Sequence, residues 1–174
     1  GIGSTVAATA AERDDTLEKS LANRLERWRA NGCTTVEVKS GYGLTPSGET
    51  RLLELMRGAA QRVPVRLQRT ALLLHALPPE FRERRAEYLD AMIGKVLPDI
   101  QARQLASAVD VFCEPVAFSV EECRAVLLKA KELGLDVKLH ADQFERSGGA
   151  ALAAELGVCS ADHLESASAE DWKR

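Results

Sequence analysis

Short apolar segments rich in β-branched residues alternate with amphipathic segments along the chain. The strand-like segments are 34–39, 65–74, 109–114, 136–140 and 159–163. Helical spacing of apolar residues predicts helices over 14–31, 45–59, 80–105, 119–133 and 149–156, with a kink or break at Pro98. Strands separated by helices pair in parallel through right-handed crossovers. The alternation therefore predicts an α/β fold of about five parallel βα units.

Two architectures share this pattern, an open doubly wound sheet and part of a (β/α)8 barrel. His75, Glu114, His140 and His163 stand at or just beyond the C-terminal ends of four different strands, where a barrel collects its catalytic groups. An open sheet would gather such groups at one switch point, and the sequence has neither a GxGxxG turn nor a Walker loop to bind a nucleotide there. We therefore predict a partial (β/α)8 barrel.

Composition and charge narrow the classes of partner and compartment. Lys and Arg total 23 against 26 Asp and Glu, a net charge of -3, so the chain offers little basic surface for nucleic acid. The four cysteines are scattered without a CxxC pair, which is typical of reduced thiols. No apolar run approaches the roughly 18 residues of a membrane span, and the first residues do not read as a secretory signal. We expect a cytoplasmic protein that binds neither nucleic acid nor membrane.

All three histidines of the chain, His75, His140 and His163, end apolar strands. A single histidine in such a position is more often a hydrogen-bonded structural residue. Three at the same end of successive strands instead favour metal binding or acid/base chemistry, because neutral imidazole is a common metal ligand that titrates near neutral pH. This pattern suits metal-assisted hydrolysis, with His140 as the strongest candidate.

Five blocks around these histidines resemble the imidazolonepropionases of the amidohydrolase superfamily. The blocks are 36–44 (VEVKSGYGL), 74–80 (LHALPPE), 109–114 (VDVFCE), 138–143 (KLHADQ) and 160–165 (SADHLE). Residues 1–9 extend the resemblance over nearly the whole chain. Members of this family open the ring of 4-imidazolone-5-propanoate to give N-formimino-L-glutamate in histidine degradation, so the resemblance implies a hydrolase acting on a cyclic amide C–N bond.

The resemblance also implies a role for five residues. His140 would be a metal ligand, and His163 would face the metal and orient the attacking water. Tyr42, His75 and Gln143 would contact the substrate. Each has an ordinary alternative: Tyr42 as an aromatic on the barrel rim, Gln143 as a solvated loop amide, and His163 as a cap of its own strand.

Three further polar residues have open roles. Lys39 invites comparison with the carboxylated lysines of other amidohydrolases, but it lies on an early strand where the family has no such residue, so we interpret it as structural. Glu114 precedes Pro115, and its carboxylate could simply accept hydrogen bonds from loop amides. Asp142 follows the strand that carries His140, and no role is predicted for it.

The resemblance finally implies that parts of the enzyme are missing from this sequence. The superfamily binds its metal through a His-x-His pair on the first strand and an Asp on the last, and neither the pair nor a strand beyond His163 is found here. We interpret residues 1–174 as one partial domain from the middle of the enzyme, without the first and last barrel strands and the small β domain, and inactive alone. The complete enzyme would hold one zinc or iron ion and act on a small molecule, and a homo-oligomer is a further hypothesis.

Two other readings remain open. Another cyclic amidohydrolase, such as a nucleobase-type deaminase, would share the metal geometry, although the blocks at 40–43 and 75–79 argue against it. The chain could also be a non-catalytic fragment whose exposed sheet edges pair with another copy.

Overall fold

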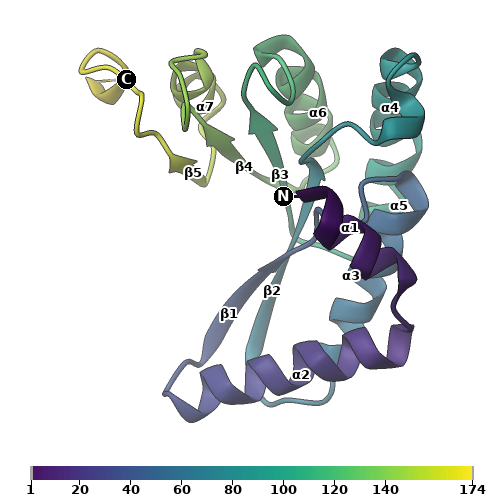
Figure 1. Ribbon diagram of the computed structural model, residues 1–174. Coiled ribbons are helices and arrows are strands. Elements are labelled where there is room, and N and C mark those ends of the chain that lie inside the picture. The colour runs from purple at the N-terminus through teal and green to yellow at the C-terminus, as the bar shows by residue number, and fades with distance from the viewer. Residues whose placement is uncertain (1, 174) are drawn as a thin grey trace.

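Five parallel strands form one sheet in the order of the chain, β1-β2-β3-β4-β5. They are β1 (Thr35–Lys39), β2 (Arg66–Leu74), β3 (Ala108–Cys113), β4 (Asp136–Ala141) and β5 (Ser160–His163). The computed structural model describes residues 2–173, and Figure 1 shows how the helices between the strands cover one side of the sheet. The predicted α/β fold with five parallel strands is confirmed.

The sheet is strongly curled, as contacts between strands that are not neighbours demonstrate. The Lys39 ammonium on β1 lies 2.7 Å from carboxylate oxygens of both Asp110 on β3 and Asp162 on β5. In a flat sheet β1 and β5 would be roughly 19 Å apart, because neighbouring strands are spaced by about 4.8 Å. Curvature alone brings these side chains together, and the architecture is therefore that of a partial (β/α)8-type barrel.

The helices match the predicted segments closely, with one addition. They are α1 (Ile2–Ala11), α2 (Asp14–Ala30), α3 (Pro46–Ala60), α4 (Arg85–Ala91), α5 (Leu97–Ala102), α6 (Val120–Glu132) and α7 (Gly149–Leu156), with single turns η1 (Pro79–Phe81) and η3 (Asp171–Lys173). The predicted segments do not include α1, and none of its residues is buried. None of the helices within the described range is long and apolar enough to cross a membrane.

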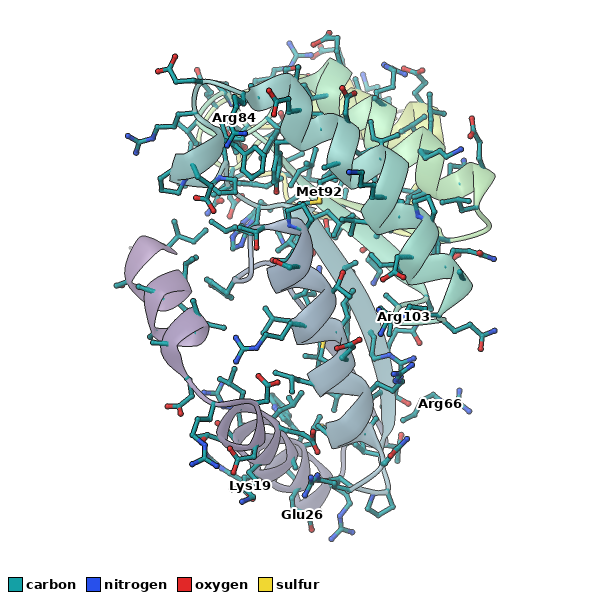
Figure 2. All side chains as sticks on the ribbon, turned by 90° about the vertical axis from the view of Figure 1, so that its right-hand side faces the viewer. Lys19, Glu26, Arg66, Arg84, Met92 and Arg103 are labelled. Carbon is teal, nitrogen blue, oxygen red and sulfur yellow. The ribbon has the colours of Figure 1, made fainter. Side chains whose placement is uncertain are left out.

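The long helix predicted over 80–105 is interrupted. Between α4 and α5 the backbone widens into a π-helical turn, η2 (Met92–Val96). Proline has no amide hydrogen and its ring clashes with the carbonyl four residues earlier, so Pro98 is the physical reason for the wider winding just before it. Met92 is completely buried, and Figure 2 labels it between Arg84 and Arg103, near the two ends of this helical stretch. The predicted irregularity at Pro98 is confirmed.

The two faces of the sheet differ in chemistry. Residues facing the helices are apolar and form the main core, as at Leu73, Val111 and Leu139. The alternate residues face the inside of the curl and are largely polar there, because side chains of successive strand residues point to opposite faces. The inner face carries Glu37, Lys39, Thr70, Leu72, Asp110, Phe112, Lys138, His140, Ser160 and Asp162. The apolar strand character expected from the sequence therefore holds for one face only.

The three histidines lie at one end of the sheet, as predicted. His75 directly follows β2, His140 is the last residue but one of β4, and His163 ends β5. Parallel strands place all these positions at the same edge, the edge at which barrels carry their active sites.

Candidate active site at the C-terminal edge of the sheet

A cavity of about 180 Å³ opens at this edge, and we call it the rim cavity. Its lining residues are Leu72, His75, Phe112, His140, Gln143, Phe144 and His163. The structure thus brings together four of the five predicted site residues around one space. The fifth, Tyr42, packs edge-on against the His75 ring with a centroid separation of 5.2 Å.

His140 is held on the inner face by a buried carboxylate. Its Nδ1 atom lies 2.9 Å from Oδ1 of Asp110, whose side chain is fully buried. A carboxylate accepts hydrogen bonds, so Nδ1 carries the hydrogen of this pair. The lone pair of the neutral ring is then on Nε2, which is the atom through which His140 can bind a metal ion.

Lys39 links Asp110 and Asp162 through one ammonium group, with 2.7 Å to each carboxylate. We call these three residues and His140 the Lys39 network. Burial lowers the pKa of Lys39, but its hydrogen bonds to the two aspartates outweigh this effect and raise the pKa overall. Burial raises the pKa of Asp162, and the hydrogen bond and charge of Lys39 reverse the shift, so that its pKa lies below the usual range. Lys39 is therefore a charged bridge, in agreement with its interpretation as a structural residue.

The same network contains the best candidate metal donors among the described residues. One atom from each of Asp110, His140 and Asp162 lies within 4.8 Å of the others. Such a set of imidazole and carboxylate ligands could hold a metal ion. However, the Lys39 ammonium already forms an ion pair with each carboxylate, and Oδ1 of Asp110 accepts the hydrogen bond from Nδ1 of His140. Oδ2 of Asp162 lies 3.4 Å from Nε2 of His140 but is also the oxygen that accepts from Lys39, so Nε2 of His140 is the donor best placed to face an ion.

His163 reaches the same cavity because its backbone breaks the alternation of β5. Asp162 faces the inside of the curl, so an ordinary strand would direct the next side chain toward the helices. His163 and Leu164 instead have positive φ angles of 74° and 67°, a conformation that is uncommon outside glycine. The His163 ring consequently lies 5.5 Å from the His140 ring, between centroids.

His75 is fixed by the turn that follows β1. Its Nδ1 atom lies 2.7 Å from the carbonyl oxygen of Gly41. Burial lowers the pKa of His75, and the hydrogen bond to Gly41 only partly opposes this shift. A neutral ring is therefore favoured at the edge of the rim cavity. Tyr42, whose ring packs against that of His75, is 39% exposed beside it.

Gln143 is positioned by Glu114, which directly follows the neighbouring strand β3. Its backbone amide donates to Oε1 of Glu114 at 2.6 Å. The carboxylate of Glu114 thus accepts from a loop amide, as its sequence context indicated. Its second oxygen, Oε2, is buried and has no hydrogen-bond partner within the described part of the chain.

Asp142 shapes the same loop from the other side. Its buried carboxylate accepts hydrogen bonds from the amides of Ser147, Gly149 and Ala150 and from the Ser147 hydroxyl. It thereby caps the start of α7 and bends the chain after β4. The sequence left the role of Asp142 open, and the structure assigns it to this loop.

Sequence reasoning missed Asp110 and Asp162 as partners of His140. The available signal was a charged residue within an otherwise apolar strand, as in Val109-Asp110-Val111. In the parallel register Asp162 lies opposite His140, and Phe112 lies opposite His140 on the other side. An aspartate two residues before Phe112 therefore shares the face of the histidine.

The chain is similar in sequence to curated imidazolonepropionases. The chain is 46% identical over 171 residues to an imidazolonepropionase of Erwinia tasmaniensis, covering 98% of this chain and 42% of that protein. It is 48% identical over 165 residues to one of Mesorhizobium japonicum, with 95% and 40% covered, and 46% identical over 165 residues to one of Pseudomonas fluorescens, with 95% and 41% covered. No family model matches the chain.

The chain spans about two fifths of the length of these curated relatives. The matched regions nevertheless include almost all of its residues, and with them the rim cavity and the Lys39 network. The resemblance inferred from the five sequence blocks is confirmed: over nearly its whole length this chain is a relative of the imidazolonepropionases.

Proposed function

We propose that the protein containing this chain hydrolyses the ring of 4-imidazolone-5-propanoate to N-formimino-L-glutamate, a step of histidine degradation. The observation that carries the proposal is the convergence of Tyr42, His75, Gln143, His140 and His163 at one end of a curled parallel sheet. The names of the similar proteins support the choice of substrate. On this proposal residues 1–174 are one part of a longer hydrolase domain.

The proposal includes one zinc or iron ion, held in part by Nε2 of His140. A bound ion of this kind lowers the pKa of a coordinated water toward neutrality and polarises a carbonyl oxygen. Asp110 accepts the hydrogen bond from Nδ1 of His140, which would leave Nε2 as the ring atom that holds the ion. The remaining donors would come from outside the described residues, because structural zinc sites use about four ligands and catalytic ones about three protein ligands.

The other residues bind and orient the substrate. The rings of His75 and Tyr42 lie side by side. Together these two side chains would position the imidazolone ring and its carboxylate tail. The Gln143 amide would hydrogen-bond a ring N–H or carbonyl group, since an amide side chain both donates and accepts. His163, whose ring stands beside His140, would orient the attacking water and is the proposed catalytic acid or base.

A full-length protein containing this chain allows a direct test. We expect loss of the ultraviolet absorbance of imidazolone propionate and formation of N-formimino-L-glutamate, in proportion to bound metal. A metal-loaded protein that leaves this substrate intact but deaminates a nucleobase would overturn the proposal in favour of the other class of cyclic amidohydrolase.

A second candidate is self-assembly of the isolated chain. Within the described residues β1 and β5 each pair with one strand only, and unpaired strand edges are templates for pairing with another copy. Sedimentation of the 174-residue chain at several concentrations would test it: a monomer at all concentrations would exclude this candidate.

The compartment and oligomeric state are part of the same proposal. All four cysteines, Cys33, Cys113, Cys123 and Cys159, are free thiols. Free thiols are typical of a reducing compartment, which supports the cytoplasm as the place of action. A homo-oligomer stays a prediction, to be tested by sedimentation of the full-length protein.

A further inference from the structure

Glu49 is a fully buried carboxylate in the first turn of α3, pointing at the turn that carries Tyr42. Its Oε2 atom accepts a hydrogen bond from the Gly41 amide at 2.8 Å. Its Oε1 atom accepts from the amides of Gly43 at 2.8 Å and Leu44 at 2.7 Å. The buried Ser40 hydroxyl accepts a hydrogen bond from the Leu72 amide at 3.1 Å, and its interaction with the Glu49 carboxylate lowers the pKa of Glu49 against the larger effect of burial. One side chain therefore fixes most of the backbone donors of the turn over residues 40–44.

The turn has little room to adopt another shape. A Cβ atom on Gly41 would lie 2.8 Å from Leu72 Cδ2 and 3.0 Å from His75 Nδ1. A Cβ atom on Gly43 would lie 2.3 Å from the carbonyl carbon of Gly48, at the start of α3. Gly41 also has a φ of 106°, a conformation that favours glycine. The turn is thus packed directly against both the His75 ring and the helix that carries Glu49.

The Gly41 carbonyl connects the turn to His75 through a hydrogen bond. A carbonyl oxygen can only accept a hydrogen bond, so the 2.7 Å contact requires the hydrogen on Nδ1 of the ring. In the neutral ring Nε2 then has no hydrogen and can only accept. A group that meets Nε2 in the rim cavity is therefore a donor, such as a ring N–H, whereas a carboxylate would find no partner there.

We propose that Glu49 is a positioning residue: by fixing the turn over 40–44 it holds His75 in the tautomer with hydrogen on Nδ1, and so selects a hydrogen-bond donor on the substrate. This inference rests on the proposed function only for the identity of that donor, the N–H of a cyclic amide. The tautomer itself is a property of the chain without substrate. Burial of His75, which lowers its pKa, is consistent with the neutral ring that the tautomer requires.

Nitrogen-15 NMR of the histidine rings tests the inference, because it distinguishes a protonated from an unprotonated ring nitrogen. The chain has three histidines, so the signals of His75 can be assigned by their loss in His75→Gln. At about pH 8, where the ring is neutral, we expect hydrogen on Nδ1 and none on Nε2 of His75. Hydrogen on Nε2 in the unmodified chain would overturn the proposal.

The role of Glu49 is tested by Glu49→Gln, which places an amide donor where backbone donors point. We expect the His75 signals to shift toward the average of the two tautomers, while those of His140 and His163 stay in place. Glu54→Gln is the matched control, because Glu54 lies on the same helix but forms an ion pair with Arg103 at the surface. Unchanged His75 signals in a folded Glu49→Gln chain would show that Glu49 has no positioning role.

Ser40→Ala provides a second variant if Glu49→Gln does not fold. It removes the hydroxyl that interacts with Glu49 and accepts from the Leu72 amide, and it leaves the three amide hydrogen bonds to Glu49, so a smaller shift of the His75 signals in the same direction is expected. The absence of any shift would contradict the proposal. Since these spectra need neither metal nor substrate, the tautomer can be confirmed even when a full-length protein fails to hydrolyse imidazolone propionate, which would refute the proposed function alone.

Discussion

Nδ1 of His140 lies 2.9 Å from Oδ1 of Asp110, and the other oxygen of the same carboxylate lies 2.7 Å from the Lys39 ammonium. Asp110 therefore joins the candidate metal ligand to a charged bridge on β1. A histidine that binds a metal through one ring nitrogen commonly donates a hydrogen bond from the other to a carboxylate. This hydrogen bond fixes the orientation of the ring and increases its basicity. The position of Asp110 fits this role.

The first prediction follows from that pair. In a full-length protein Asp110→Asn should weaken metal binding by roughly 10- to 100-fold, the usual effect of removing an outer partner of a ligating histidine. Competition with a metal-binding dye measures the change. Asp136→Asn, at the exposed start of β4, is the control and should bind metal normally. Equal affinity for Asp110→Asn and the unmodified protein would contradict the role of Asp110.

The second prediction concerns His140 itself. His140→Ala in a full-length protein should abolish both metal content and turnover, because the coordination shell loses the imidazole that the Lys39 network holds in place. Elemental analysis after dialysis and the substrate assay measure the two effects. Retention of full metal occupancy would refute His140 as a ligand.

The third prediction separates His75 from His140. His75→Ala should keep the metal, because Nδ1 of His75 is bound to the Gly41 carbonyl and its proposed partner is the substrate. Turnover should fall by roughly 10²- to 10³-fold, the effect of losing one preorganised hydrogen bond that acts in the transition state. The same two assays apply. If His75→Ala loses metal as readily as His140→Ala, the division of roles between the two histidines is wrong.

The fourth prediction concerns the 174-residue chain alone. We expect it to bind zinc and iron weakly and to hydrolyse no imidazolone propionate. Few metal-binding atoms lie next to Nε2 of His140, and the Lys39 ammonium competes with a metal ion for the carboxylates of Asp110 and Asp162. Elemental analysis and the absorbance assay on the purified chain provide the measurement. Stoichiometric metal together with measurable turnover would contradict this expectation.

The sequence predicted the strands and most helices because their signals are local. The capping box at the start of α6, for example, is formed by Ser119 and Glu122, which lie within four residues of each other. Helix α1 lies outside the predicted segments, and none of its residues is buried. The positions of His75, His140 and His163 at one edge followed from strand order alone, since parallel strands end together.

The polar partners of the site could not be predicted in the same way. Lys39 is 71 residues from Asp110 and 123 residues from Asp162 along the chain. These residues lie on β1, β3 and β5, which are not neighbours in the sheet, and only the curvature of the sheet brings them into contact. Likewise, no sequence pattern predicted the positive φ of His163, which turns its ring toward His140.

The last prediction concerns the loop that carries Gln143, which depends on Asp142. Asp142→Ala should lower the free energy of unfolding by about 2 kcal/mol at pH 7, because the variant loses a helix cap and leaves buried amides of α7 without an acceptor. Urea unfolding followed by circular dichroism measures the change. Asp136→Ala, which removes an exposed aspartate from the start of β4, should have little effect.

The pH dependence of this difference provides its own check. Burial raises the pKa of Asp142, but the hydrogen bonds from Ala150 and Ser147 outweigh burial, so the pKa lies below its ordinary value. A carboxyl whose pKa is lower in the folded than in the unfolded chain stabilises the fold fully above its unfolded pKa of about 3.9. That contribution disappears as the pH falls through the folded value. The difference between the unmodified chain and Asp142→Ala should therefore be constant from pH 7 to about pH 5 and shrink below about pH 4. A difference that grows on acidification would contradict the assignment of Asp142 as an ionised cap.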